Sequence, residues 1–391
     1  MPSSGLRLRA PILAGTVASI TGQAASTGVV LAALSALGAT QAQIVSVVFV
    51  MLLLYGTLSI VLSWRYKMPI SIVWSTPGAA LLVSAGGLGF GFETAVGAFI
   101  VASLLIALTG LWPSLGKLVT SIPKPIAGAM LAGVIFSFCI APFSAAGKYP
   151  LIVIPAILVW LVLYKLAQVW ATPIAMVVLL ALTAIELQIS IPVEDILPAA
   201  QLIAPQFSVV AIISIGIPLY LVTMASQNIP GIAIMKSYGY EVPFRPAMLA
   251  TGLGSLVANF FGGFVTNLAA ITAALNANEQ AHRNPEKRWI ASVSGGVVYL
   301  LLALTAGASI SFVIQAPREI ILAGAGLALF ATMIGALSSI VEEPELRLPA
   351  VIAFLVASSG FTAYSIGPAF WALVVGVLVW LWLGKRKKTA A

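Results

Sequence analysis

The chain has 391 residues, of which 61% are hydrophobic and only 8% are charged, and its mean hydropathy is +1.10. Soluble domains carry about 25% charged and 45–50% apolar residues, so this composition argues against a soluble enzyme, a nucleic-acid-binding domain and a disordered chain. The apolar residues come in runs of roughly 20, the length with which an α-helix crosses about 30 Å of hydrocarbon. We therefore predict an all-α polytopic membrane protein and interpret its net charge of +8 as a sign of membrane topology.

Fourteen spans are predicted in chain order, and two of them, 69–85 and 264–277, are unusually short. Loops that contain prolines, glycines and charged residues separate them. The predicted ranges are 10–36, 41–63, 69–85, 92–111, 124–141, 150–168, 172–189, 207–235, 245–261, 264–277, 289–313, 318–340, 347–362 and 365–384. No cleavage site follows the basic N-terminus, so the first span is expected to be retained.

The basic residues test this count, because lysine and arginine accumulate in cytoplasmic loops. With alternating spans and both termini cytoplasmic, 17 of the 19 basic residues fall on the inner side. Only Lys148 and Arg318 fall outside. The inner set includes Lys117, Lys124 and the C-terminal run that ends at Lys388. The charge pattern therefore predicts that both termini are cytoplasmic.

Similar segments recur at similar distances along the chain. Gln23 in span 1 corresponds to Gln227 in span 8, and the paired short spans place Ser75-Thr76 against Thr266-Asn267. These matches predict two repeats of seven spans, 10–190 and 207–384. Because seven is odd, the second repeat would be inverted relative to the first, as in many transporters.

Both short spans are predicted to be an extended strand followed by a half-helix. In span 3, Ser75 and Thr76 precede Pro77, which is the sequence form of a helix start. In span 10, Gly262-Gly263 is expected to break the preceding helix and Thr266-Asn267 to cap the next one. Two half-helix N-termini that converge inside the membrane would favour an anion. The alternative is that helix packing absorbs both irregularities.

Amide side chains add to this predicted centre. Gln23, Gln227 and Asn228 lie in apolar helices, and Asn228 is followed by an expected helix break at Pro230-Gly231. Such groups face a substrate or hydrogen-bond to neighbouring helices. No acidic residue is expected at the centre, since Glu93 lies near the outer end of span 4.

An enzyme is not expected from these residues. The single aspartate, Asp195, and the single histidine, His282, lie in loops on opposite sides, and Cys139 is the one cysteine. Intramembrane hydrolysis, a metal site and a thiolate cluster therefore lack their usual residues. There is also no phosphate-binding glycine loop for ATP. We expect no cofactor and no metal, and a passive channel remains an alternative to a carrier.

Three blocks resemble the benzoate/proton symporter family of bacterial inner-membrane carriers. They are 69–82 (PISIVWSTPGAALL), 228–253 (NIPGIAIMKSYGYEVPFRPAMLATGL) and 262–274 (GGFVTNLAAITAA). The resemblance implies uptake of benzoate with protons on the inverted-repeat fold of the nucleobase/cation symporters and the sulfate and bicarbonate transporters. It implies a core domain of spans 1–4 and 8–11, a gate domain of spans 5–7 and 12–14, and elevator-like movement between them. A homodimer is also implied.

The resemblance places the substrate at spans 1, 3, 8 and 10. The nucleobase carriers have glutamates in spans 8 and 10, where this chain has neutral residues that would suit an organic anion. The expected binding residues are Gln23, Trp74, Ser75, Thr76, Gln227, Asn228, Phe264, Thr266 and Asn267. Trp74 and Phe264 are candidates for the slot that holds the ring, although Trp74 could equally be ordinary core. The proton carrier stays open between Glu93 and the substrate itself. Another organic or inorganic anion is the alternative substrate.

Overall fold

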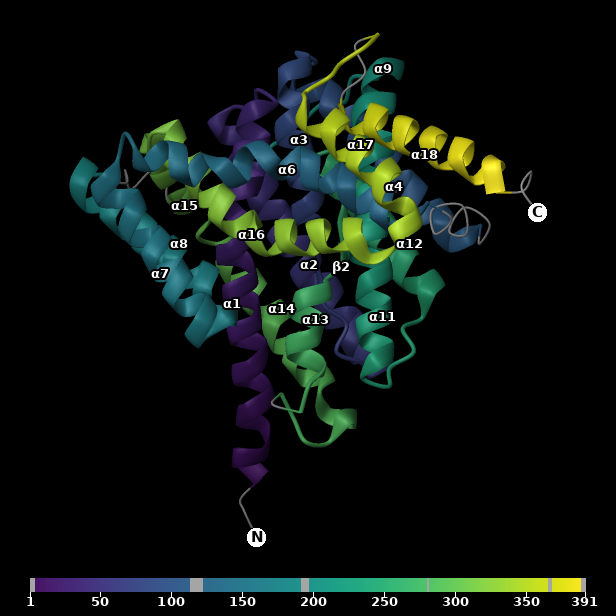
Figure 1. Cartoon of the computed structure of the whole chain (residues 1–391). Coiled ribbons are helices and arrows are strands. Elements are labelled where there is room, and N and C mark those ends of the chain that lie inside the picture. The colour runs from purple at the N-terminus through teal and green to yellow at the C-terminus, as the bar shows by residue number, and fades with distance from the viewer. Residues whose placement is uncertain (1–3, 113–121, 191–196, 280, 365–367, 388–391) are drawn as a thin grey trace.

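The computed structural model describes residues 4–112, 122–190, 197–279, 281–364 and 368–387 (Figure 1). Lys117, Asp195 and Lys388 lie outside these ranges. The elements of the first half are α1 (Ser4–Ala36), α2 (Gln41–Tyr66), β1 (Ile72–Trp74), α3 (Thr76–Ala85), η1 (Gly86–Leu88), α4 (Phe92–Leu111), α6 (Lys124–Ala146), α7 (Pro150–Leu166) and α8 (Gln168–Leu187). Those of the second half are α9 (Val209–Ala211), η3 (Ile212–Gly216), α10 (Ile217–Thr223), η4 (Met224–Asn228), α11 (Ile229–Ser237), α12 (Phe244–Asn259), β2 (Thr266–Leu268), α13 (Ala270–Ala277), η5 (Pro285–Lys287), α14 (Trp289–Ala303), α15 (Ala306–Gln315), α16 (Arg318–Glu342), η6 (Pro344–Leu346), α17 (Arg347–Ser358) and α18 (Pro368–Lys387).

The protein is mostly helical, and each predicted span range contains a helix. Within the described ranges, seven helices are long and apolar enough to cross a membrane alone. An eighth span results if α14 and α15, which are bent by 62° at their junction, are counted together. Shorter apolar helices lie in three of the other ranges, at Thr76–Leu88, Pro150–Leu166 and Pro368–Leu383. The number fourteen and the inverted repeat therefore stay predictions.

The eighth predicted span is one continuous helical segment from Val209 to Ser237. The expected break at Pro230-Gly231 is wrong. Two π-helical turns, η3 and η4, lie within the segment, and Pro230 falls in the first turn after η4. A π-turn shifts the hydrogen-bond pattern by one residue, so a proline, which has no N–H to donate, is accommodated without ending the helix.

Two short strands pair antiparallel at the centre of the helical assembly. Ile72 lies opposite Leu268, Val73 opposite Asn267 and Trp74 opposite Thr266. Backbone bonds extend the pairing at both ends, from Ser75 N to Val265 O at 3.1 Å and from Ala269 N to Ser71 O at 2.9 Å. Each strand leads directly into a half-helix, so the predicted strand-plus-half-helix form of both short spans is confirmed.

The start of the second half-helix differs from the prediction. Thr266 and Asn267 do not cap a helix, because they belong to β2, and α13 begins only at Ala270. Ala269 occupies the cap position and has no polar side chain to bond the first turn. Pairing with β1 keeps residues 266–268 extended and moves the helix start towards the C-terminus.

Helix α1 is the long helix around which the site is built (Figure 1). It packs against α3, α13 and α14 on one side and against α8 and α16 on the other. Helices α7 and α8 pack against each other, as do α6 and α16, while α12 packs against α2 and α4. Segments from both halves of the sequence therefore surround α1.

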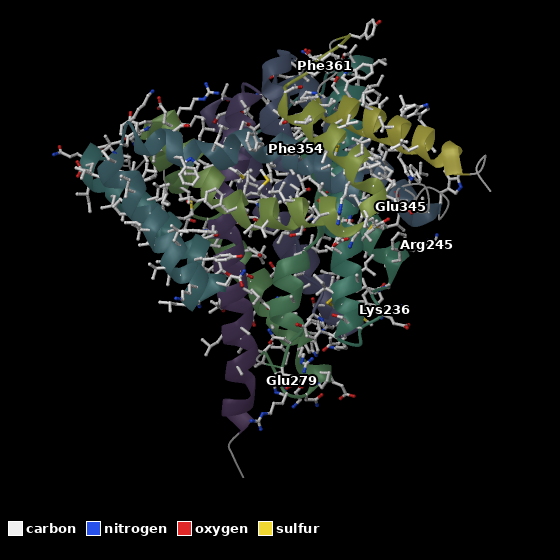
Figure 2. All side chains as sticks on the ribbon, in the orientation of Figure 1. Lys236, Arg245, Glu279, Glu345, Phe354 and Phe361 are labelled. Atoms are coloured by element: carbon white, nitrogen blue, oxygen red, sulfur yellow. The ribbon has the colours of Figure 1, made fainter. Side chains whose placement is uncertain are left out.

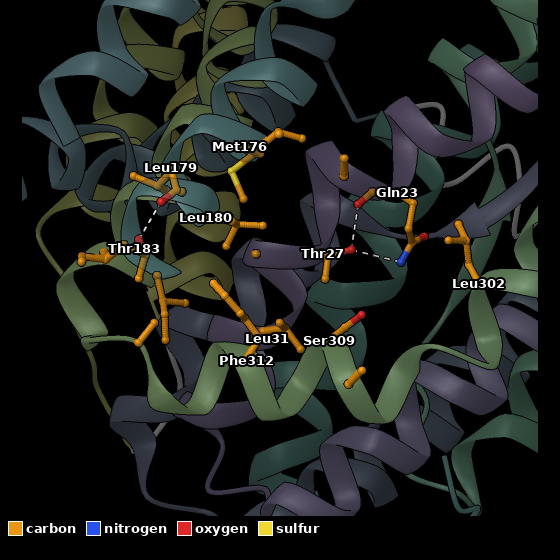
Figure 3. Close-up of a pocket in the computed structure, with 18 of the residues that line it drawn as sticks. Gln23, Thr27, Leu31, Met176, Leu179, Leu180, Thr183, Leu302, Ser309 and Phe312 are labelled. Atoms are coloured by element: carbon orange, nitrogen blue, oxygen red, sulfur yellow. Dashed lines mark hydrogen bonds between the residues drawn. The ribbon is translucent and has the colours of Figure 1, made fainter. Parts of the chain in front are cut away.

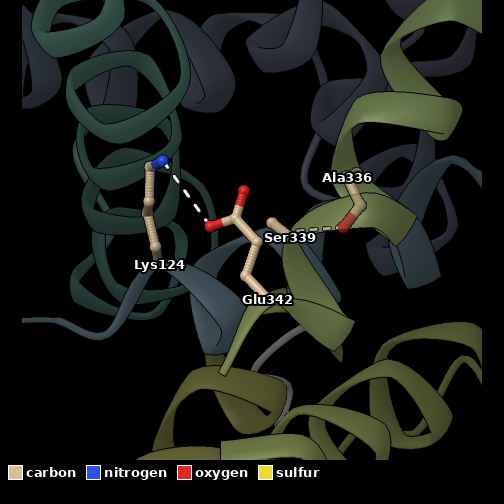
Figure 4. Close-up of polar contacts among 4 residues, drawn as sticks. All are labelled: Lys124, Ala336, Ser339 and Glu342. Atoms are coloured by element: carbon tan, nitrogen blue, oxygen red, sulfur yellow. Dashed lines mark hydrogen bonds and ion pairs between the residues drawn. The ribbon is translucent and has the colours of Figure 1, made fainter. Parts of the chain in front are cut away.

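Helices α6 and α16 run antiparallel, and an ion pair joins them at each end. Lys124 begins α6 and its Nζ lies 3.7 Å from a carboxylate oxygen of Glu342 at the end of α16 (Figure 4). At the other end, Lys148 Nζ lies 2.8 Å from Glu319 Oε1. Both pairs are exposed, so they mark the alignment of the helices more than they stabilise it.

Charged residues from the predicted inner loops gather along one edge of the molecule. Figure 2 shows Lys236, Arg245, Glu279 and Glu345 on the lower and right-hand sides of the view, whereas Phe361, near the end of the predicted span 347–362, lies at the top. The orientation of the termini in the membrane stays a prediction.

We expect close contact between α6 and α16 to depend on Gly326. A Cβ atom at this position would overlap the carbonyl oxygen of Phe138 on α6. Overpacking of this kind typically costs about 1–3 kcal/mol. Gly326→Ala should therefore lower the melting temperature of the purified protein in detergent. Gly335 lies on the same helix, and a Cβ added there would meet no atom within 4 Å, so Gly335→Ala is the matched control. Equal melting temperatures for the two variants would show that the contact between α6 and α16 does not depend on Gly326.

Candidate functional site

A cavity of about 450 Å³ lies between α1, α8, α15 and α16 (Figure 3). This volume is within the range of small-molecule sites. Its wall is mainly aliphatic, with contributions such as Leu31, Leu179 and Phe312. No charged residue is among the described residues that line it. The polar lining residues are Gln23, Thr27, Thr183 and Ser309.

Gln23 is the one predicted binding residue that lines this cavity. Its Nε2 donates to Thr27 Oγ1 at 3.1 Å, one turn further along α1. Its Oε1 accepts a hydrogen bond from the Tyr55 hydroxyl at 2.6 Å. Tyr55 comes from α2 and is fully buried. The amide is therefore held between two helices at the cavity wall.

Trp74 lies behind this wall and does not line the cavity. Its Nε1 donates to Ser26 Oγ at 2.8 Å, and its ring contacts Tyr55 edge-on with 5.7 Å between centroids. Phe264 stacks on Trp74 with 6.3 Å between centroids and is also fully buried. The two aromatic side chains thus form the support of the site in this structure.

At the N-terminus of α3, most polar groups already form hydrogen bonds within the protein. Ser75 Oγ accepts from Gly78 N at 3.1 Å and from the Thr223 hydroxyl at 2.8 Å. Pro77 has no N–H, and Ser75 N is bonded across the strand pair. Thr76 is half-buried and its hydroxyl has no bond to the described residues. The cap predicted at Ser75 is confirmed, and it occupies most donors at this end.

Three predicted residues lie in or against the strand β2, in different environments: Thr266 and Asn267 belong to the strand, and Asn228 in η4 contacts it. Thr266 Oγ1 lies 2.9 Å from Ser255 Oγ on α12, and Asn228 Oδ1 accepts from Leu268 N at 2.9 Å. Both side chains therefore support the strand. Asn267 is fully buried, and neither its Nδ2 nor its Oδ1 has a partner among the described residues. Buried polar atoms without partners are uncommon and call for an explanation.

The N-terminus of α13 is left open, in contrast to that of α3. Its cap residue, Ala269, cannot bond the N–H groups of the first turn, and such groups carry a partial positive charge. This turn lies against α1 next to Gln23. A Cβ built at Gly22 would be 3.4 Å from Thr272 Oγ1 and 3.8 Å from the Tyr299 hydroxyl. The first turn of α13 therefore packs against α1 at Gly22, the residue that precedes Gln23.

The remaining two candidates lie away from the cavity wall. Gln227 is half-buried in η4, and its side chain makes no hydrogen bond with the described residues. Glu93 lies in the first turn of α4, where Oε1 accepts from Gln43 Nε2 at 3.3 Å. Gln43 in turn belongs to the capping box of α2. Glu93 is therefore part of a contact between two helix N-termini.

Comparison with known proteins decides the family. The profile described as "Benzoate membrane transport protein" matches residues 8–381. The chain belongs to this family. It is 37% identical to "Inner membrane protein YdcO" of Escherichia coli, covering 93% of each chain. It is 34% identical to the "Benzoate membrane transport protein" of Acinetobacter baylyi, covering 84% of this chain and 83% of that one.

The fold is shared with a more distant solved structure. The transmembrane domain of the cyanobacterial bicarbonate transporter BicA matches with a TM-score of 0.59 at 17% identity, over 96% of this chain and 97% of that one. Together with the apolar helices, the family makes this chain an inner-membrane transport protein and not an enzyme.

The sequence pattern did not point to Tyr55, to Thr27 or to the wall of the cavity that α8, α15 and α16 form. Thr27 follows Gln23 by four residues, a spacing that puts both on one face of a helix, so this signal was present. Tyr55 and the residues of α8, α15 and α16 meet Gln23 only through the packing of helices distant in sequence. The position of the cavity therefore could not be predicted from the sequence and is given by the tertiary structure.

We expect Ser75 to matter for the stability of the protein. Ser75→Ala removes the cap of α3 and leaves the Thr223 hydroxyl without its acceptor, and losing an N-cap costs about 0.5–2 kcal/mol. The melting temperature in detergent should fall. Ser84 is in the same helix but only bonds back to Leu81 O, so Ser84→Ala is the control and should change little. If Ser75→Ala is as stable as Ser84→Ala, the cap at Ser75 does not stabilise the protein.

Proposed function

We propose that this protein is a secondary active transporter that imports benzoate, or a similar small aromatic carboxylate, together with protons. The observation that carries the proposal is an apolar cavity with one oriented amide, Gln23, at its wall. The helix that carries Gln23, α1, also packs against α13, whose N-terminus has no side-chain cap. Membership of the benzoate membrane transport family supports the substrate. An aromatic acid has the matching shape, with an apolar ring and a compact charged end.

The carboxylate is proposed to bind where Gln23 meets the first turn of α13. The free N–H groups of this turn and the positive end of its dipole attract an anion. No acidic residue is among the described cavity-lining residues, so nothing there repels a carboxylate. Asn267 lies three residues before α13 and supplies a further amide without a partner among the described residues. We therefore rank Gln23 and Asn267 first among the predicted binding residues.

The ring is proposed to occupy the aliphatic part of the cavity. Leu31 and Gly28 of α1 form one side, and Met176 and Leu179 of α8 face them. Burial of an aromatic ring contributes by area, at about 25 cal/mol per Å². The same wall separates the proposed core domain, which contains α1, from the proposed gate domain, which contains α8 and α16. Displacement of core against gate would then change access to the substrate, as an elevator mechanism requires.

Most of the other predicted residues are proposed to support the binding residues without contacting the substrate. Ser75, Asn228 and Thr266 hold the strand pair in position, and Trp74 with Phe264 supports the helix that carries Gln23. Thr76 and Gln227 have side chains without hydrogen-bond partners among the described residues, and they stay candidates for contact in another conformation. Glu93 stays the candidate for proton coupling through its own carboxylate, with the proton carried on the substrate as the alternative.

The proposal includes the predicted membrane arrangement. Fourteen spans in two inverted repeats, 10–190 and 207–384, would leave both termini in the cytoplasm. A homodimer in the bacterial inner membrane is the proposed assembly. Transport of another organic or inorganic anion, or passive conduction of an anion, are the competing functions. The fold shared with a bicarbonate transporter is the observation that favours the former.

Uptake into proteoliposomes tests the proposed function. Labelled benzoate should accumulate above its equilibrium level when the outside is made acidic, because inward proton movement would supply the free energy. Accumulation should disappear when a proton ionophore abolishes the gradient. Uptake that only reaches equilibrium would favour a channel. Uptake of other anions but not of benzoate would show that the substrate is a different anion.

Gln23 should determine the affinity for the carboxylate. Gln23→Met keeps the length of the side chain but removes its N–H donors, and losing a bond to a charged group costs about 1.5–3 kcal/mol, or roughly 10- to 150-fold in affinity. The Michaelis constant for benzoate should rise accordingly in the uptake assay. Gln41 is exposed at the start of α2, so Gln41→Met is the control. An unchanged Michaelis constant in Gln23→Met would show that the carboxylate does not bind at Gln23.

A further inference from the structure

The orientation of the Gln23 amide follows from the hydrogen bonds of Thr27. Thr27 Oγ1 donates its only hydrogen to the backbone carbonyl of Gln23 at 2.7 Å. The same oxygen also lies 3.1 Å from the Gln23 side chain. Since a hydroxyl has one hydrogen to give, it can only accept in this second contact. The atom facing Thr27 must then be Nε2.

This assignment fixes the remaining atoms of the amide. With Nε2 towards Thr27, Oε1 faces the Tyr55 hydroxyl, 2.6 Å away, and Tyr55 must donate. Nε2 has two hydrogens and Thr27 takes one of them. Gln23 lines the cavity (Figure 3). One N–H donor is therefore left for a ligand, while Oε1 already accepts a hydrogen bond from Tyr55.

Tyr55 is itself held in place from two sides. Its ring meets Tyr299 edge-on with 4.7 Å between centroids and an angle of 88° between planes, and it meets Trp74 at 71°. Next to it, Gly56 lets α2 approach α14 closely, because a Cβ there would be 2.9 Å from Gly296 O. The hydroxyl consequently has little freedom to leave Gln23.

We propose that Tyr55 and Thr27 are positioning residues that lock the Gln23 amide with one N–H towards the cavity and thereby select ligands whose polar end only accepts hydrogen bonds. This inference rests on the proposed function and deepens it. A carboxylate meets the locked donor favourably in every orientation of its two oxygens. A flipped amide would present Oε1 and repel the carboxylate, but it would accept a bond from a ligand that carries N–H groups.

The test compares benzoate with benzamide, which has the same ring and an N–H-bearing polar end. Dissociation constants are measured by competition against labelled benzoate on the purified full-length protein. In Tyr55→Phe and Thr27→Val, benzoate should bind roughly 2- to 10-fold more weakly, the effect of losing one orienting hydrogen bond. Benzamide should bind as before or more tightly. The ratio of the two constants therefore shifts towards benzamide.

Two further variants separate positioning from general damage. Thr27→Ser keeps the hydroxyl and should restore the wild-type ratio. Tyr220→Phe removes a buried hydroxyl that bonds Thr109 at 2.6 Å in α4, outside the cavity lining, and should leave the ratio unchanged. If Tyr55→Phe cannot be purified, the two Thr27 variants carry the comparison. Equal weakening towards both ligands, or an unchanged ratio, would overturn the inference.

A separate measurement distinguishes this inference from the proposed function. Absence of benzoate binding by the wild-type protein would overturn the function. The hydrogen bond from the Tyr55 hydroxyl to Gln23 Oε1 is then tested by the melting temperatures of Tyr55→Phe, Gln23→Met and the double variant. A double variant that loses less than the sum of the single losses supports the coupling. Simple additivity would overturn it.

Discussion

The antiparallel pairing of β1 and β2 is the constraint on which the rest of the site depends. At membrane depth no water is available for exposed backbone groups, so an extended segment persists only if every N–H and C=O finds a partner in the protein. The two strands supply part of this to each other. Side chains complete it: Ser59 Oγ bonds both the N–H and the carbonyl of Ile72, and Asn228 bonds Leu268 N. Removal of the pairing would leave neither half-helix a fixed starting point.

The pairing also makes the two half-helices unequal. Helix α3 begins directly after β1 with a serine cap, and its donors are already engaged. Helix α13 follows β2 in the same way but has alanine at the cap, so no side chain bonds the N–H groups of its first turn. An anion would accordingly be attracted more strongly to α13 than to α3. Two segments with the same strand-then-helix form thus differ in electrostatic character because of one residue at each cap.

Helix α1 connects the strand pair with the cavity. Ser26 and Thr27 both donate to carbonyls four residues earlier in the same helix, which costs the helix little and satisfies their hydrogens. Their oxygens then accept from Trp74 and Gln23, respectively. Neighbouring residues point about 100° apart around a helix. One hydroxyl therefore anchors the aromatic support, and the other orients the amide at the cavity wall.

The sequence by itself determined the membrane class, the helical segments and the two short spans, because hydrophobic length and the residues Ser75, Pro77 and Gly262 act locally. It also identified Gln23 as a polar group in an apolar helix. The tertiary structure decided two things that depend on distant partners: the start of α13 at Ala270, after the residues that pair with β1, and the location of the cavity. The continuity of the helix through Pro230 depends on the adjacent π-turn η4. The contacts of Trp74 and Asn228 also come from packing, since their partners, Ser26 and Leu268, are remote in the chain.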